Sequence, residues 1–372
     1  MLNIDTEIFL ANHWQRTPAL LRSAIPDFQP PISADELAGL AMEAEVEARI
    51  IELEDPSYRL SHGPFEAGDF NRTLPWTLLV QAVDLWVPEV AALRELVRFL
   101  PSWRFDDIMV SYASHGGGVG PHFDNYDVFL LQGEGCRRWR IGQWCDEQEP
   151  LEAHPDLRLL AEFRQQDEYL LEPGDILYVP PRVAHWGIAE GDCTTFSIGF
   201  RAPRINEMLS RWTDAALERL DGELFYADAH SEPASRPGEI RRQDRSRISM
   251  QLQAAIDQIE DDSWFGELVT EPREAALQFG SDAQSLNALG GLGSSISLAP
   301  GARIAWQEDA DAICLFANGQ STTTTRDYLP TIIDLCDTCV LPQATVTSLL
   351  ESSPGRSLLA FLLNTGCLDA DH

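Results

Sequence analysis

Apolar residues in the first hundred positions recur mostly with the spacing of helices. Residues 33–46 open with Ser33, which favours a helix start, and continue with acids and then with apolar residues at helical intervals. Residues 76–87 and 88–100 are similarly rich in apolar positions. We expect helices over all three segments.

From Asp106 the pattern changes to an alternation of period two, which is typical of strands. Glycine, proline and acidic residues interrupt it at short intervals, for example at 116–118 and 172–175. Many short strands at close spacing favour a sandwich or barrel over alternating strand–helix units. The expected strands cover 108–112, 128–131, 138–141, 169–171, 176–179 and 195–200.

After Arg204 the helical period returns. Residues 206–220 and 244–259 are amphipathic, and a polar Pro/Gly/Ser stretch at 231–238 connects them. The last hundred residues mix both patterns around a glycine-rich turn at 290–293. We expect strands at 304–306 and 312–316, and short helices at 328–339, 344–350 and 358–364.

Composition limits the possible partners. With 372 residues, about two to three domains are expected. The 59 acidic residues outnumber the 27 basic ones, giving a net charge of −32, and every basic residue is arginine. Such a chain repels polyphosphate and attracts basic partners, so we expect no direct nucleic-acid binding. The absence of lysine excludes phosphate-loop NTPases and Schiff-base enzymes.

The seven cysteines are scattered and odd in number, and the acidic start lacks the pattern of a signal peptide. No apolar run is long enough to span a membrane. We therefore expect a cytoplasmic protein with reduced thiols and no membrane contact. Cys336 and Cys339 form a CxxC pair without a second pair nearby, so we assign it no metal or redox role.

The candidate chemistry centres on Gly120-Pro121-His122-Phe123-Asp124. On an extended strand, His122 and Asp124 point to the same face. His185, after a proline turn, supplies a third ligand, and two histidines with one carboxylate form the facial triad of non-haem Fe(II) oxygenases. An HxD also occurs by chance on surfaces, and His185 alone could be a core residue. The combination, with its glycine run and strand-like flanks, favours iron.

An iron site of this kind needs an electron donor. If the donor is 2-oxoglutarate, its distal carboxylate requires a buried cation, and arginine suits that geometry. Arg137, Arg138 and Arg140 lie on one expected strand, where Arg137 shares a face with Trp139 and Arg138 with Arg140. Nothing local chooses between the two faces, and a solvated edge strand is the alternative.

These motifs resemble the bacterial JmjC-type ribosomal oxygenases, which hydroxylate an arginine of large-subunit ribosomal protein sixteen. The resemblance is close over about residues 1–210 and architectural beyond them. It implies the iron ligands His122, Asp124 and His185, with Fe(II), 2-oxoglutarate and O₂ as cofactor and co-substrates. It places 2-oxoglutarate on Arg137, with Ser111 and Ser197 assisting. The matching segments are 62–65, 78–83, 114–142, 171–181 and 197–203.

The resemblance also implies an α+β fold built on a double-stranded β-helix, the jelly-roll or cupin core of JmjC proteins. It divides the chain into a catalytic domain with N-terminal helices (1–204), a helical dimerisation segment (205–265) and a winged-helix-like C-terminal domain (266–372). Trp186 departs from the pattern, since a smaller or polar residue is expected there. We expect it to reshape the substrate mouth.

The function favoured at this point is protein-arginine hydroxylation of a basic ribosomal protein. An arginine substrate calls for carboxylates at the barrel mouth, and we expect Asp106 and Asp107, or less directly Asp127, to take the guanidinium. The alternatives are a cupin-type metal enzyme that does not use 2-oxoglutarate and a non-catalytic dimeric scaffold for a basic protein. A homodimer is expected from two apolar stripes: Ile205, Met208, Leu209 and Trp212, and Ile248, Met250, Leu252, Ile256 and Ile259.

Overall fold

The alternating segments between residues 105 and 200 do form strands, and four strands from the first eighty residues join them in two facing sheets. The computed structural model describes residues 2, 4–54, 56–229, 231–233, 236–257, 263–273, 295–309 and 311–369. The chain divides into two units, Met1–Ala202 and Pro203–His372. No helix in these described ranges is long and apolar enough to cross a membrane.

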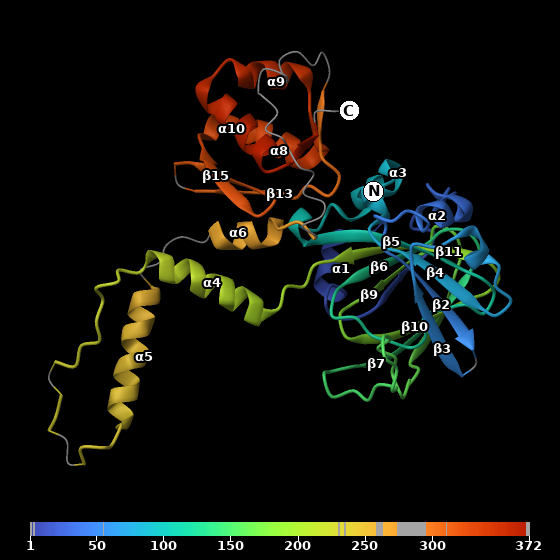
Figure 1. Cartoon of the computed structure of the whole chain (residues 1–372), viewed down its shortest axis with the longest axis horizontal. Coiled ribbons are helices and arrows are strands. Elements are labelled where there is room, and N and C mark those ends of the chain that lie inside the picture. The colour runs from blue at the N-terminus through green and yellow to red at the C-terminus, as the bar shows by residue number, and fades with distance from the viewer. Residues whose placement is uncertain are drawn as a thin grey trace. The chain divides into compact units, whose positions relative to one another are not determined.

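The first unit contains an eight-stranded sheet and a three-stranded sheet with antiparallel neighbours throughout (Figure 1). The larger sheet runs β1 (Ala19–Leu21), β9 (Ile176–Val179), β6 (Val128–Gln132), β11 (Cys193–Phe200), β5 (Phe105–Ala113), β4 (Trp76–Val80), β2 (Ala48–Glu54) and β3 (Ser57–His62). The smaller runs β10 (Val183–Ala189), β7 (Arg137–Trp144) and β8 (Asp167–Leu171).

Each face of the larger sheet buries a different core. Val128 and Leu130 on β6 pack with Trp139 and Ile141 on β7, which joins the two sheets. The opposite face packs on the N-terminal helices, for example through Phe9 and Leu37. These helices are α1 (Thr6–Asn12), α2 (Ala34–Leu40) and α3 (Pro88–Ala91), with 3₁₀ turns at Ala67–Phe70, Val83–Leu85, Ala92–Val97 and Ser102–Arg104.

The prediction of a helix over residues 76–87 is wrong. Trp76–Val80 is the central strand β4, followed by a short 3₁₀ turn. All five strand residues are buried because both faces of the sheet are covered there, and a continuous apolar run carries no period that separates strand from helix. The segment 88–100 is helical only in short pieces. The expected helix at 33–46 ends at Leu40, although Ser33 caps it as predicted.

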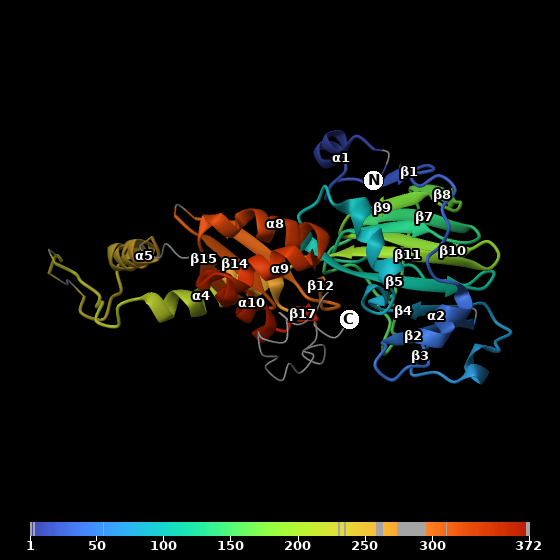
Figure 2. The same cartoon turned by 90° about the horizontal axis from the view of Figure 1, so that it is seen from above.

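The second unit begins with the amphipathic helices expected from the sequence, α4 (Ile205–Arg219) and α5 (Arg242–Ile256). Ile259 and the glycine turn at 290–293 lie outside the described residues. The predicted division at 265/266 falls inside α6 (Ser263–Thr270). The remaining elements gather around one core (Figure 2): β12 (Ile296–Leu298), β13 (Ile304–Glu308), β14 (Ile313–Ala317), β15 (Gln320–Thr324), a 3₁₀ turn (Arg326–Tyr328), α8 (Leu329–Thr338), β16 (Val340–Leu341), α9 (Gln343–Leu350), α10 (Ser353–Asn364) and β17 (Leu368–Asp369).

Candidate metal and co-substrate site

His122, Asp124 and His185 come together in the first unit as the sequence predicts, with one ligand atom from each within 4.8 Å of the others. The Oδ2 atom of Asp124 lies 3.8 Å from Nε2 of His122 and 3.6 Å from Nε2 of His185. His185 is buried, whereas His122 and Asp124 are partly exposed. The cluster therefore has a closed side and an open side, which suits a metal that also binds exchangeable ligands.

Backbone contacts hold the three ligands in register. His122 and His185 exchange both backbone hydrogen bonds, at 3.1 and 2.8 Å, and the N–H of Arg182 donates to the carbonyl of Asp124. The segment before His122 runs against β10 so closely that a Cβ on Gly118 would lie 2.3 Å from the carbonyl oxygen of Gly187. The HxD segment is thus a connection between β5 and β6 with one bridge, rather than part of a continuous strand.

Hydrogen bonds on the far side of each ring orient the two histidines. Nδ1 of His122 lies 3.0 Å from the carbonyl of Gly120, and Nδ1 of His185 lies 3.0 Å from that of Val183. Because a carbonyl only accepts, each Nδ1 carries the hydrogen and each Nε2 presents a lone pair to the cluster. Burial, reinforced by the neighbouring His122, lowers the pKa of His185 to about 4. A neutral imidazole is the form that coordinates a metal.

The structure decides which arginine faces the interior. Arg137 is 5% exposed, and its Nη1 donates to Oγ of Ser111 on β5 at 3.3 Å. Its Nε and Nη2 are buried without a hydrogen-bond partner in the part of the chain that the structure describes. A buried guanidinium with two unsatisfied N–H groups is matched to a carboxylate, which accepts such a pair in bidentate fashion. The residues present therefore fit a dicarboxylate co-substrate.

Arg138 and Arg140 lie on the outer face of the small sheet. Both pair with Glu168, and Arg138 also pairs with Glu190. Trp186 faces the same outer side, where Arg140 lies over its ring at 5.1 Å and Phe163 meets it edge-on. The expectation that Trp186 reshapes the substrate mouth is therefore wrong, because the residue after an inward-facing His185 points outward on a strand.

The three aspartates proposed for substrate binding have different surroundings. Asp107 shares the inward face of β5 with Ser111, and its Oδ2 accepts hydrogen bonds from the side chain of Gln81 at 2.6 Å and the N–H of Ala82 at 3.1 Å. Asp106 pairs with Arg201 at 3.3 Å and lies where the register of β5 against β11 shifts, so the alternation of the strand does not fix its side. The role of Asp106 in substrate binding stays a prediction.

Asp127 is misassigned as a substrate contact. It is fully buried and accepts hydrogen bonds from Tyr178, Gln15 and Arg104. This network ties β6 and β9 to the N-terminal segment, so the carboxylate has a structural role. In the sequence, Asp127 lies between the iron-binding motif and a buried strand. That position is compatible both with a structural role and with a substrate contact, so the sequence alone could not separate the two.

Two further residues near the ligands complete the site. Ser197, proposed to assist the co-substrate, lies buried on β11. Thr195 pairs with Ser111 across the two strands, and Ser197, two residues after Thr195, therefore faces inward on the same side as Ser111. Tyr126, which sequence reasoning missed, hydrogen-bonds Asp124. The charge of Asp124 raises the pKa of Tyr126, and burial of the hydroxyl and this hydrogen bond add to the effect. Its position two residues after a ligand was the one available signal.

Comparison with protein families identifies both units. A JmjC domain model matches residues 92–208, and a ROXA-like winged helix model matches residues 258–369. An AraC-like ligand binding domain model also matches residues 163–275.

Individual relatives agree with the family models. The chain is 42% identical over 273 residues to the Escherichia coli ribosomal protein uL16 3-hydroxylase, an alignment that covers 73% of each protein. It is 40% identical to a probable ribosomal oxygenase of Haemophilus influenzae over 56% of this chain and 52% of that one. The X-ray structure of E. coli YcfD matches 99% of both chains with a TM-score of 0.84 and 35% identity. Another YcfD structure, in complex with cobalt and 2-oxoglutarate, matches with a TM-score of 0.82 and 34% identity. The chain therefore belongs to the family of JmjC-domain ribosomal oxygenases.

Proposed function

We propose that this protein is an Fe(II)- and 2-oxoglutarate-dependent oxygenase that hydroxylates an arginine side chain of ribosomal protein uL16. His122, Asp124 and His185 would hold the iron, and Arg137 with Ser111 would hold the distal carboxylate of 2-oxoglutarate. The observation that carries the proposal is the buried Arg137, whose two unsatisfied N–H groups share the interior of the barrel with the ligand triad. A cupin enzyme without 2-oxoglutarate would have no use for that cation.

The bound iron and 2-oxoglutarate would activate O₂, and the protein would hold the metal ligands and the substrate in position. The Nδ1 hydrogen bonds fix both imidazoles, and Tyr126 fixes the carboxylate of Asp124. Asp107 would pair with the substrate guanidinium, since a carboxylate can accept several hydrogen bonds at once, as it does here from Gln81 and Ala82. Ser197 is assigned to the co-substrate side of the same interior.

The choice of substrate rests on two independent lines of support. The E. coli relative is named for hydroxylation of uL16, and the net charge of −32 favours a basic protein over a nucleic acid as the partner. Because bacterial ribosomal proteins are in the cytoplasm, the proposed reaction would take place there.

The proposal is tested by turnover of purified protein with Fe(II), 2-oxoglutarate, O₂ and recombinant uL16. We expect succinate release together with the addition of one oxygen atom to a single arginine-containing peptide by mass spectrometry. Succinate release without modification of uL16 would contradict the substrate, and no succinate at all would contradict the reaction. A uL16 variant with the modified arginine changed to lysine serves as the matched control, because lysine lacks the planar fork.

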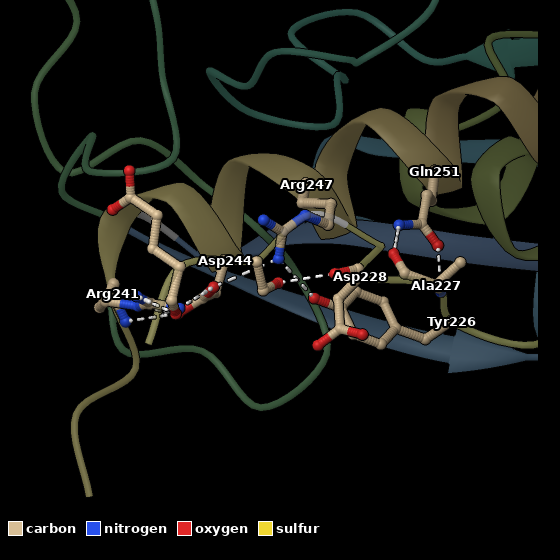
Figure 3. Close-up of polar contacts among 9 residues, drawn as sticks. Tyr226, Ala227, Asp228, Arg241, Asp244, Arg247 and Gln251 are labelled. Atoms are coloured by element: carbon tan, nitrogen blue, oxygen red, sulfur yellow. Dashed lines mark hydrogen bonds and ion pairs between the residues drawn. The ribbon is translucent and has the colours of Figure 1, made fainter. Parts of the chain in front are cut away.

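We also propose that α4, α5 and residues 221–229 between them form a homodimer contact. Polar contacts pin this segment to α5 (Figure 3): Gln251 exchanges two hydrogen bonds with Ala227, and Arg247 donates to the hydroxyl of Tyr226. Arg241 and Arg247 flank Asp244 and lower its pKa. The arrangement is held in place while its large apolar side chains remain exposed, among them Leu209, Phe225, Met250 and Leu252.

A further inference from the structure

Buried side-chain atoms without a hydrogen-bond partner are few in the described residues, and three of the four belong to one strand. They are Nε and Nη2 of Arg137 and Nε1 of Trp139 on β7, and Oγ1 of Thr77 elsewhere. A buried N–H that finds no acceptor costs free energy. The proposed function accounts for the two Arg137 atoms, but it leaves the indole N–H of Trp139 unexplained.

Trp139 lies between the two ends of the proposed site. On the inner face of the small sheet, Arg137 pairs with Ala189, Trp139 with Gly187, and Ile141 with His185. The guanidinium carbon of Arg137 lies 5.8 Å from the centre of the Trp139 ring. The centre of the His185 ring also lies 5.8 Å from the centre of the Trp139 ring. Trp139 is thus adjacent both to the proposed carboxylate anchor and to a proposed metal ligand.

The neighbouring strand is shaped to receive this ring. A Cβ on Gly187 would lie 2.8–3.0 Å from three carbon atoms of the indole, so a larger residue would displace it. The ring is 4% exposed and packs with apolar residues such as Leu130 and Leu177. Apolar packing alone does not require the indole N–H, and a purely apolar ring brings no donor that has to be satisfied.

We propose that the indole N–H of Trp139 donates a hydrogen bond to a carboxylate oxygen of the bound 2-oxo dicarboxylate, which makes Trp139 a co-substrate-binding residue beside Arg137. This inference rests on the proposed function. A dicarboxylate offers several acceptor positions, more than Arg137 and Ser111 occupy. A hydrogen bond to a charged acceptor in a buried site contributes more than a neutral one, so its loss is measurable.

The test is the binding of 2-oxoglutarate to Co(II)-loaded protein by isothermal titration calorimetry, without substrate or O₂. Trp139→Phe is expected to weaken 2-oxoglutarate binding by about tenfold to a hundredfold, the range of a charge-assisted hydrogen bond. The affinity for Co(II) alone should stay within about twofold. Trp186→Phe, the same substitution on the outer face of the sheet, should leave both affinities unchanged.

A 2-oxoglutarate affinity within twofold of the wild type in Trp139→Phe would overturn the inference. If that variant does not fold, judged by circular dichroism and thermal melting, Trp139 is replaced by benzothienylalanine, which keeps the ring shape and removes only the N–H. The same criterion then applies. Failure of the wild-type protein to bind 2-oxoglutarate would overturn the proposed function as well, whereas intact binding by the variant overturns only the role of Trp139.

Discussion

Arg137 is the residue on which co-substrate binding should depend most. Arg137→Ala removes one partner of a buried charge pair, which costs about 2–5 kcal/mol. The 2-oxoglutarate concentration for half-maximal turnover should therefore rise at least about tenfold, while the Fe(II) requirement stays nearly constant. Arg138→Ala is the matched control, since Arg138 is half-exposed and paired with Glu168 and Glu190 on the outer face. A large effect in the control instead would reverse the assignment.

Asp124 should be required for metal binding and not for folding. Its side chain is partly exposed and lies in a connecting segment, outside the barrel core. Asp124→Ala should therefore abolish measurable Co(II) binding and turnover while the melting temperature of the metal-free protein stays close to that of the wild type. Unchanged metal affinity in this variant would remove Asp124 from the ligand set.

Asp107 should separate substrate binding from co-substrate turnover. Asp107→Asn keeps the shape of the side chain and removes the charge that would pair with a guanidinium. Hydroxylation of a uL16 peptide should fall at least about tenfold, the cost of a lost charge-assisted contact, while uncoupled 2-oxoglutarate turnover persists. Asp106→Asn is the comparison variant, because the Asp106 carboxylate is already paired with Arg201. Equal peptide hydroxylation by wild type and Asp107→Asn would exclude this carboxylate as the arginine contact.

For single residues, the sequence predicts the motifs well, but it does not predict which side of a sheet a side chain faces. His122, Asp124 and His185 were recognisable because their residue types and flanking patterns are specific to a facial triad. The alternation of a strand could pair Arg137 with Trp139 but could not say which side of the sheet is inside. The burial of Asp127 was hidden as well, since its partners Gln15, Arg104 and Tyr178 lie far apart along the chain.

At the scale of elements, a hairpin between β7 and β8 supports the segment that carries His122. Leu151 pairs with Leu160, and the N–H of Leu160 donates to the carbonyl of Pro121 at 2.9 Å. His154 anchors this hairpin, since its Nδ1 accepts from the N–H groups of Asp156 and Leu157 and its Nε2 donates to the carbonyl of Tyr58. One imidazole thus joins the hairpin to β3.

His154→Ala should loosen the hairpin without unfolding the barrel. Three modest hydrogen bonds are lost, for a destabilisation of about 1–3 kcal/mol in total. Limited proteolysis should cut between residues 145 and 166 faster than in the wild type, and cleavage elsewhere in the barrel should not change. His115→Ala, which removes a single contact to Gly191 in another turn, should not accelerate cleavage there. An unchanged cleavage rate in His154→Ala would show that the hairpin is held by its other contacts.

The elements that could be predicted either show a clear period or lie between clear turn residues. The strands β5, β7 and β11 carry an alternating pattern or lie between clear turn residues, and the amphipathic helices α4 and α5 show their period directly. The strand β4 was mistaken for part of a helix, because its apolar residues continue without a period into the apolar positions that follow it. The strands β1 to β3 were missed, because their pairing partners are set by the tertiary fold and not by local preference.

At the scale of the whole molecule, assembly is decided by apolar surface that the single chain leaves uncovered. On α4, Ile205 and Leu217 are 77% and 64% exposed, and on α5, Met250 and Leu252 are 65% and 60% exposed. The buried residues of these two helices are small, namely Ala216 and Ala255. Large apolar side chains gathered on an exposed surface usually mark an interaction site. A closed twofold pairing of identical surfaces would cover them.

The wild-type protein should therefore have the mass of a dimer by light scattering at micromolar concentration. The double substitution Met250→Arg and Leu252→Arg should shift it to the monomer mass, because two desolvated charges of like sign would face their copies across the interface. Gln320→Arg adds a charge to an exposed residue of β15, outside these helices, and should leave the dimer intact. Since His122, Asp124, His185 and Arg137 all lie in the first unit, the monomeric variant should retain 2-oxoglutarate binding. A monomeric wild type would contradict the dimer, and loss of 2-oxoglutarate binding on dissociation would show that the partner subunit is needed to complete the site.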